Sequence, residues 1–314
     1  MHRIAATPGG WNPQAEGVIF IQQTPAPIVF ITAADTDIQT LATARSKLPA
    51  GFPSLRVANL LQLQQQLTID TYAEEILEKA EVIIIRLLGG RSYWSYGLEV
   101  VREVVEKTKA ALIVMPGDNS PDPDLISHST VSLSAVDRLW HYFTECGVEN
   151  FVNGLRFAAD IGLKTAYNPP LPKEVSRVGI YNWLATESTD SSSAASLDNL
   201  SGVANADRVG ILFYRAHYLS GNLAPIDALC QALVDRKLAP VPVFVSSLRE
   251  PDVQAELGQY FQPKNAEQIQ LLLNTTSFAI SGFRSQDREL ENIRSLDVPV
   301  LQVIFSGGTA AQWK

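Results

Sequence analysis

Apolar runs alternate with amphipathic segments along the first half of the chain. Four runs are apolar almost throughout and predict strands: residues 26–35, 55–63, 81–90 and 111–118. Other segments space their apolar side chains as a helix does: residues 36–49, 68–80, 95–107, 134–147 and 150–162. Strands of this kind, alternating with amphipathic helices, are typical of a parallel sheet that is covered on both faces.

The second half repeats this alternation after a polar, proline-rich segment. Strands are predicted at residues 176–183, 209–214, 239–247, 277–284 and 299–308, and helices at 225–237 and 252–261. Residues 185–207 are too rich in Ser, Asp and Asn to build a core, which predicts an exposed loop. We therefore expect two open, mainly parallel-sheet α/β units of the Rossmann-like or flavodoxin-like kind. Their predicted bounds are residues 1–164 and 176–314, joined by a linker at 165–175.

The last residues, "SGGTAAQWK", follow a predicted strand at the point where a helix should begin. A natural domain seldom ends with a strand whose helix is incomplete. We therefore expect the second domain to be truncated and the chain to be a fragment of a longer protein.

Composition narrows the class of protein. The chain has 314 residues, of which 46% are hydrophobic and 18% charged, as in globular proteins with a sizeable core. Its 25 basic residues stand against 33 acidic ones, which argues against nucleic-acid binding. It has no apolar run of about 20 residues, so no membrane span is predicted. The absence of a secretory signal, with only Cys146 and Cys230 as thiols, predicts a cytoplasmic protein.

The motifs of several site classes are missing. The glycines fit neither the dinucleotide pattern Gly-x-Gly-x-x-Gly nor a Walker A loop, so no nucleotide site is predicted. The four histidines are far apart, and no Cys or His pair has zinc-site spacing. "SGG" and "SGN" are not the nucleophile elbow of hydrolases. We therefore expect neither a metal nor a cofactor in this chain.

Glycine and basic side chains gather where the predicted strands end. Ligands of open α/β sheets bind outside the carboxyl ends of the strands. Arg215 and His217 would share one face if their strand continued that far. Arginine binds carboxylates with two parallel hydrogen bonds, so a shared cleft between the two halves would suit a ligand with carboxylates or amides. The predicted ligand-binding residues are Arg86, Gly89, Gly90, Arg91, Arg215, His217, Gly221, Asn222 and Arg284.

Each of these residues also has a structural interpretation. Arg86 lies inside an apolar strand and could pair with an acid such as Glu99, because a bare buried charge is costly. His217 could cap a loop, and Asn222 could cap the helix that follows. The glycines could simply form tight turns. Three aromatic residues in "SYWSYG" fit core packing better than a platform for a flat ligand: Tyr93, Trp94 and Tyr96.

Several segments resemble the N-terminal region of the large subunits of cobaltochelatase, the CobN type, to which the magnesium chelatase H subunits are related. They are "VIIIRLLGGRSYWSYGLE", "ALIVMPGD", "RVGILFYRAHYLSGNLAPIDALCQALVDRKLAPVPVFVSSL" and "VPVLQVIFSGGTAAQW". The resemblance runs along the whole chain and is most specific at "RLLGG-x-x-YW" and "YR-x-H-x-x-x-GN". The residues that match the family's motifs are Arg86, Gly89, Gly90, Arg215, His217, Gly221 and Asn222.

The resemblance implies a ligase that inserts cobalt into hydrogenobyrinic acid a,c-diamide in cobalamin biosynthesis. It implies ATP and magnesium on separate AAA+ partner subunits, an adaptor subunit, and a cobalt ion and a tetrapyrrole as substrates. This chain would be roughly the first quarter of the subunit. The catalytic residues are expected in the C-terminal body that it lacks, so we expect the fragment alone to be inactive.

Three alternatives remain open at the level of sequence. One is a magnesium chelatase H subunit, which inserts magnesium into protoporphyrin IX in chlorophyll biosynthesis. Another is a module that docks the AAA+ subunits without touching the tetrapyrrole. A third is an independent binding protein of the periplasmic type, against which the missing signal peptide and the abrupt end both weigh.

Overall fold

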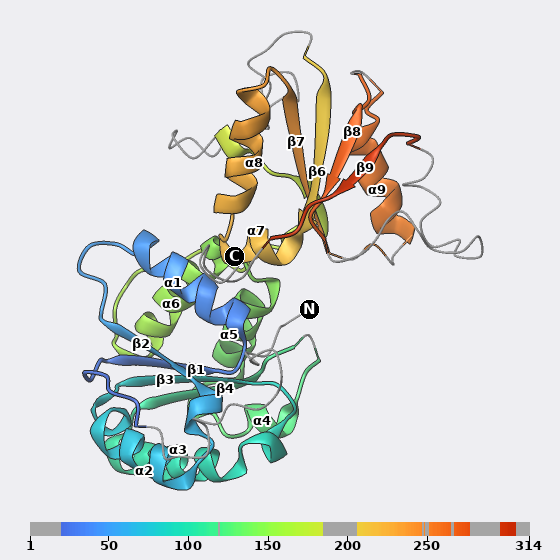
Figure 1. Cartoon of the computed structure of the whole chain (residues 1–314). Coiled ribbons are helices and arrows are strands. Elements are labelled where there is room, and N and C mark those ends of the chain that lie inside the picture. Colours follow the sequence, from blue (N-terminus) through green and yellow to red (C-terminus); the bar gives the residue numbers. More distant parts are fainter. Residues whose placement is uncertain are drawn as a thin grey trace. The chain divides into compact units, whose positions relative to one another are not determined.

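The computed structural model describes residues 20–118, 120–184, 206–246, 248, 251–264, 267–276 and 296–305. The chain divides into two compact units, residues 1–175 and 176–314 (Figure 1). Each unit contains an open sheet with helices on it, which confirms the predicted α/β class. No helix in these described ranges has the length and hydropathy that a membrane span requires.

The first unit contains a four-stranded parallel sheet in the order β2-β1-β3-β4. The two central strands are buried along their whole length, so both of their faces must be covered by helices. All four strands lie within the runs that the apolar pattern predicts. Their bounds are β1 Ile28–Thr32, β2 Leu55–Asn59, β3 Val82–Leu87 and β4 Ala111–Pro116.

Helices cover both faces of this sheet and enclose two apolar cores (Figure 1). One face carries α2 Gln66–Glu75 and α3 Ser95–Thr108, and the other carries α1 Asp35–Lys47, α5 Leu133–Glu145 and α6 Val148–Gly162. The helix predicted at 68–80 ends early, and a short 3-10 helix follows it. Shorter elements are η2 Leu60–Leu63, η3 Leu77–Lys79, η4 Arg91–Tyr93 and α4 Pro123–Ile126.

The segment predicted as a linker is held on α5 and α6 of the first unit. The Arg138 guanidinium donates to the carbonyl of Pro169 (2.6 Å). The Asn150 amide both donates to the Lys173 carbonyl (2.7 Å) and accepts from the Lys173 N–H (2.9 Å). Asp160 accepts further backbone N–H groups of this segment. Residues 165–175 are therefore bound to the first unit by side chains that satisfy their backbone.

The second unit contains a five-stranded mixed sheet in the order β5-β7-β6-β8-β9. Only β5 runs antiparallel to its neighbour. One face is covered by α8 Ala224–Val234 and the other by α9 Pro251–Phe261, each over its own apolar core (Figure 1). The strands are β5 Val178–Ile180, β6 Arg208–Tyr214, β7 Ala239–Val245, β8 Leu271–Asn274 and β9 Val300–Gln302.

Two elements of this unit differ from the prediction. Strand β8 was not predicted, because its four residues follow a polar stretch and are too few to show a period. The chain also turns into a helix, α7 Arg215–Ser220, directly after β6, where continuation of the strand was considered. The strand predicted at 277–284 and nearly all of the loop predicted at 185–207 lie outside the described residues.

Candidate functional site

Arg86 lies in β3 and is 1% exposed. Its Nη1 is 2.6 Å from Oδ1 of Asp37 in the first turn of α1, and its Nη2 donates to the carbonyl of Gly117 after β4 (3.1 Å). The other Asp37 oxygen accepts from the hydroxyl of Thr32 at the end of β1 (2.9 Å). The predicted partner Glu99 is therefore wrong. Arg86 joins the ends of three strands from inside the protein, which corrects the ligand-binding role that we predicted for it.

The turn after β3 contains the next three predicted residues. Gly89 and Gly90 have positive φ values of 90° and 75°, a region that residues with a Cβ rarely adopt. A Cβ added to Gly89 would lie 3.6 Å from Tyr93, an ordinary contact, so backbone conformation and not space requires glycine there. Arg91 follows in η4 and is exposed. Of the predicted cations in this unit, Arg91 is thus the one that faces solvent.

The aromatic cluster "SYWSYG" divides between core and surface. Trp94 is 5% exposed, and its indole N–H donates to the carbonyl of Leu63 (3.0 Å), so it belongs to the core. Tyr93 and Tyr96 are each 38% exposed. The Tyr96 hydroxyl donates to the carboxylate of Asp70 (2.9 Å). Core packing, the favoured interpretation, is confirmed for the tryptophan alone.

The junction between β6 and α7 contains Arg215 and His217. Residues two apart on a helix do not face one another, so these side chains do not share a face as a continued strand would require. The Arg215 Nε donates to the carbonyl of Ser176 (2.9 Å). Gly221 ends α7 at a φ of 70°, and its N–H donates back to the carbonyl of Tyr218 (3.2 Å). The strand-to-helix switch therefore sets the direction of both basic side chains.

The environment of His217 favours the neutral form of its side chain. Its half-buried ring meets Phe305 edge-on, with ring centroids 6.4 Å apart. Burial lowers the pKa of His217 below its ordinary value, which leaves the imidazole neutral at pH 7. A neutral imidazole offers one hydrogen-bond donor and one acceptor in place of a positive charge. His217 therefore suits an amide or a hydroxyl better than it suits a lone carboxylate.

Aromatic side chains that the sequence analysis did not single out surround this histidine's helix. Tyr218 stacks on Phe244 with centroids 4.2 Å apart and planes 14° apart, and Tyr181 meets Tyr218 edge-on at 6.2 Å. The Tyr181 hydroxyl donates to Asp227 of α8 (2.8 Å); burial, together with this bond, raises the pKa of Tyr181. The available signal was a group of three aromatic residues within six positions, at the end of β6 and in α7: Phe213, Tyr214 and Tyr218. We name the group of Tyr181, His217, Tyr218, Phe244 and Phe305 the β6 corner.

The remaining predicted residues stand apart from this group. Asn222 is exposed and caps no helix: the residue before α8 is Leu223, and the N–H of Asn222 donates to the carbonyl of His217 (3.0 Å). The capping interpretation of Asn222 is therefore wrong. Arg284 lies outside the described residues. Within the described ranges, no three His, Cys, Asp or Glu side chains are grouped so that they could hold a metal ion.

Comparison with a solved structure supports the fold. The catalytic subunit of cobaltochelatase from Mycobacterium tuberculosis superposes with a TM-score of 0.68 at 24% sequence identity. The superposition covers 91% of this chain and 22% of that one. At this sequence identity, the structural similarity is evidence for a shared fold but not for a shared catalytic activity.

Sequence comparisons define the family. The aerobic cobaltochelatase subunit CobN of a Sinorhizobium species is 37% identical over 319 residues, and that of Pseudomonas aeruginosa is 35% identical over 315. Both alignments cover 100% of this chain, which spans 24% of the length of either relative. The family model described as CobN/Magnesium Chelatase matches residues 140–314, more than half of the chain. The chain therefore belongs to the CobN/magnesium chelatase family.

Proposed function

We propose that this chain forms part of a CobN-type large subunit that inserts cobalt into a tetrapyrrole, with ATP hydrolysed on AAA+ partner subunits. The support is that two relatives named aerobic cobaltochelatase subunit CobN align with all of the chain. The same observation favours cobalt over magnesium. The proposed macrocycle is hydrogenobyrinic acid a,c-diamide, which carries both carboxylates and amides on its rim.

The part of the chain that we propose to meet this macrocycle is the surface at the β6 corner. Its support is the neutral, half-buried imidazole of His217, held against Phe305 at the carboxyl end of β6. This corner lies inside the segment matched by the family model. Arg215, two residues earlier, adds a positive charge at the same strand end. A neutral imidazole suits an amide and a guanidinium suits a carboxylate, and the rim of this macrocycle carries both groups.

Loss of the two basic side chains should weaken binding of the macrocycle. We expect the chain to bind hydrogenobyrinic acid a,c-diamide with quenching of tryptophan fluorescence, and the Arg215→Ala, His217→Ala double variant to bind about 10- to 100-fold more weakly. That range corresponds to a lost charge-assisted hydrogen bond of roughly 1.5–3 kcal/mol. The matched control is His141→Ala, an exposed histidine of α5, which should bind like the unmodified chain.

The outcomes of this experiment distinguish binding of the macrocycle from docking of the AAA+ subunits. Equal affinity of the double variant would remove Arg215 and His217 from the site. If the unmodified chain bound no macrocycle but retained the AAA+ subunits in a pull-down, the chain would be a docking module. The substrates of the magnesium enzyme, magnesium and protoporphyrin IX, are tested for comparison. If protoporphyrin IX bound more tightly than hydrogenobyrinic acid a,c-diamide, the proposed substrate would be contradicted.

A further inference from the structure

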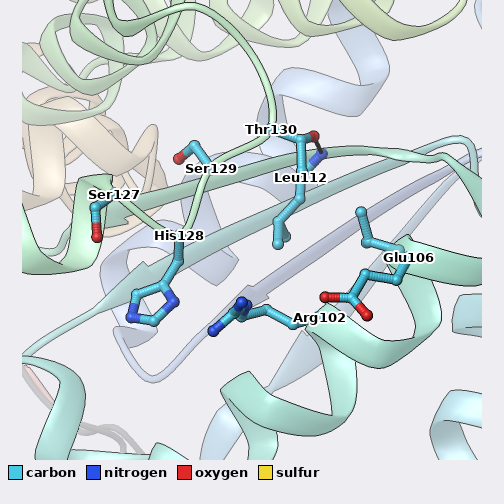
Figure 2. Close-up of a pocket in the computed structure, with 8 residues that line it drawn as sticks. Arg102, Glu106, Leu112, Ser127, His128, Ser129 and Thr130 are labelled. Atoms are coloured by element: carbon cyan, nitrogen blue, oxygen red, sulfur yellow. Dashed lines mark hydrogen bonds between the residues drawn. The ribbon is translucent and has the colours of Figure 1, made fainter.

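A cavity of about 400 Å³ in the first unit lies between α3 and the segment that follows α4 (Figure 2). The Thr130 hydroxyl on its wall accepts from the N–H of Leu112 (2.8 Å), and the Ser129 hydroxyl accepts from the N–H of Val114 (2.9 Å). The Nε2 atom of His128 is buried in this wall and is not accessible to a ligand. The hydroxyls of the wall therefore satisfy the outer edge of the sheet. A buried hydrogen bond in the second unit has a more specific role.

Tyr181 joins the end of β5 to the first turn of α8 in the second unit. The residue is 6% exposed, and its backbone N–H donates to the carbonyl of Pro242 in β7 (2.8 Å). Its hydroxyl donates to Oδ1 of Asp227 (2.8 Å). A hydrogen bond to a charged acceptor is stronger than one between neutral groups. Tyr181 is therefore held at both ends, by its backbone on the sheet and by its hydroxyl on a helix.

The ring of Tyr181 also contacts α7, the short helix that contains His217. It meets the Tyr218 ring edge-on, with centroids 6.2 Å apart, and Tyr218 in turn stacks on Phe244 of β7. A helix of six residues is too short to be stable alone, and the residue before α7 provides no side-chain cap. The position of α7 therefore depends on its packing, in which Tyr218 contacts both Tyr181 and Phe244.

The connection between α7 and α8 is short. Gly221 ends α7 in the left-handed region, and the carbonyl of His217 accepts from the N–H of Asn222 (3.0 Å). Residues 221–223 separate the two helices, and Asp227 is half-buried in the first turn of α8. Because Tyr181 contacts α7 with its ring and α8 with its hydroxyl, the bond to Asp227 holds both helices against the end of β5.

We propose that Tyr181 and Asp227 are positioning residues for the macrocycle site at the β6 corner, acting through Tyr218 on the placement of His217. This role rests on the proposed function for its ligand alone, because the placement of the imidazole is a property of the chain without ligand. Loss of the hydroxyl would free α7 and α8 to move relative to β5, and water would then reach the His217 ring. The phenol keeps its proton near neutral pH, since burial and then the bond to Asp227 raise the pKa of Tyr181.

The first experiment observes the imidazole without any ligand. The chain has four histidines, so ¹³C labelling of the histidine rings gives four signals, and His217→Gln identifies one of them by its loss. Tyr181→Phe keeps the ring and removes the hydroxyl. In this variant we expect the His217 signal to move and the pKa of His217 to rise toward its ordinary value. The reason is that burial holds this pKa down, so better hydration of the ring raises it.

Two control variants separate positioning from a general loss of stability. Tyr96→Phe removes the same kind of bond, from a tyrosine hydroxyl to Asp70 (2.9 Å), in the first unit. Val253→Ala destabilises the second unit from the core under α9, where Val253 is 0% exposed. Neither should move the His217 signal. If Val253→Ala moved this signal as much as Tyr181→Phe did, or if Tyr181→Phe left it in place, the proposal would be overturned.

Binding of hydrogenobyrinic acid a,c-diamide provides the second measurement. We expect Tyr181→Phe and Asp227→Ala each to weaken binding by about three- to ten-fold. The double variant should bind no more weakly than either single variant, because both substitutions remove the same bond. Asp227→Asn should retain most of the affinity, since its amide oxygen still accepts from the phenol. Asp227 is only half-buried, so its variants test the proposal even if Tyr181→Phe does not fold.

The results distinguish this inference from the proposed function. Additive effects of the two substitutions, or an Asp227→Asn variant that binds as weakly as Asp227→Ala, would contradict a shared positioning role. If the unmodified chain bound no macrocycle, the proposed function would fail, and the imidazole signal in Tyr181→Phe would still decide whether Tyr181 positions His217.

Discussion

Replacing Arg86 with methionine should lower the free energy of unfolding of the first unit by about 3–5 kcal/mol. The guanidinium is 1% exposed and holds Asp37 at 2.6 Å, so its removal leaves a carboxylate buried without its counter-charge. The carbonyl of Gly117 also loses a donor. Most of this cost comes from leaving the Asp37 carboxylate buried without a partner, and not from the lost attraction between the two charges.

Urea unfolding, followed by hydrogen exchange in β1 and β3, would measure this loss in the unit concerned. Arg91→Met is the matched control, because Arg91 is exposed and a surface change of this kind stays within about 0.5 kcal/mol. Adding Asp37→Leu to Arg86→Met should recover most of the stability, since neither charge is then left alone. A single-variant loss below about 1 kcal/mol would show that Arg86 is not held as an internal ion pair.

The interpretation of Arg86 shows how far sequence reasoning reaches. An arginine inside an apolar run had to be paired, and it is. The partner was wrong because the sheet order β2-β1-β3-β4 places β1 next to β3, which brings the first turn of α1 to the end of β3. Glu99 lies nearer in sequence. Strand order is a property of the tertiary structure, and one chain read alone does not reveal it.

The pattern of apolar residues predicted the longer helices and strands. The four strands of the first unit lie in apolar runs that a fully covered parallel sheet requires. Short elements did not show a period: β8 has four residues and α7 has six. The switch from β6 to α7 has no glycine or proline at the junction, so no local signal marked it.

The sequence predicted where His217 lies in the fold but not the surroundings of its side chain. The end of β6 was the predicted place for His217, and the structure puts it there in the first turn of α7. Its pKa is lowered by burial, and one of the rings it meets is Phe305, which is 88 positions later in the chain. Burial of this kind favours the neutral form of the imidazole. The surroundings of His217 therefore required coordinates, even though its place at the end of β6 did not.

Gly97→Ala should destabilise the first unit by about 3 kcal/mol, at the upper end of what overpacking a core costs. A Cβ at this position of α3 would lie 2.0 Å from Cε2 of Trp94. The indole has no room to retreat, because it is 5% exposed and its N–H is bonded to the carbonyl of Leu63 at 3.0 Å. Alanine would ordinarily be the better helix residue, so the sign of the change depends on this clash.

The same substitution elsewhere supplies the control. Gly258 lies inside α9, and a Cβ there would meet nothing within 4 Å. Gly258→Ala should therefore stabilise the second unit by about 0.5–1 kcal/mol, the ordinary gain of alanine over glycine in a helix. Urea unfolding measures both changes, and the indole N–H signal of Trp94 should move in Gly97→Ala alone. If both variants gained stability, Trp94 would be free to shift, and the 94–97 turn would not be the rigid part of the core that its contacts indicate.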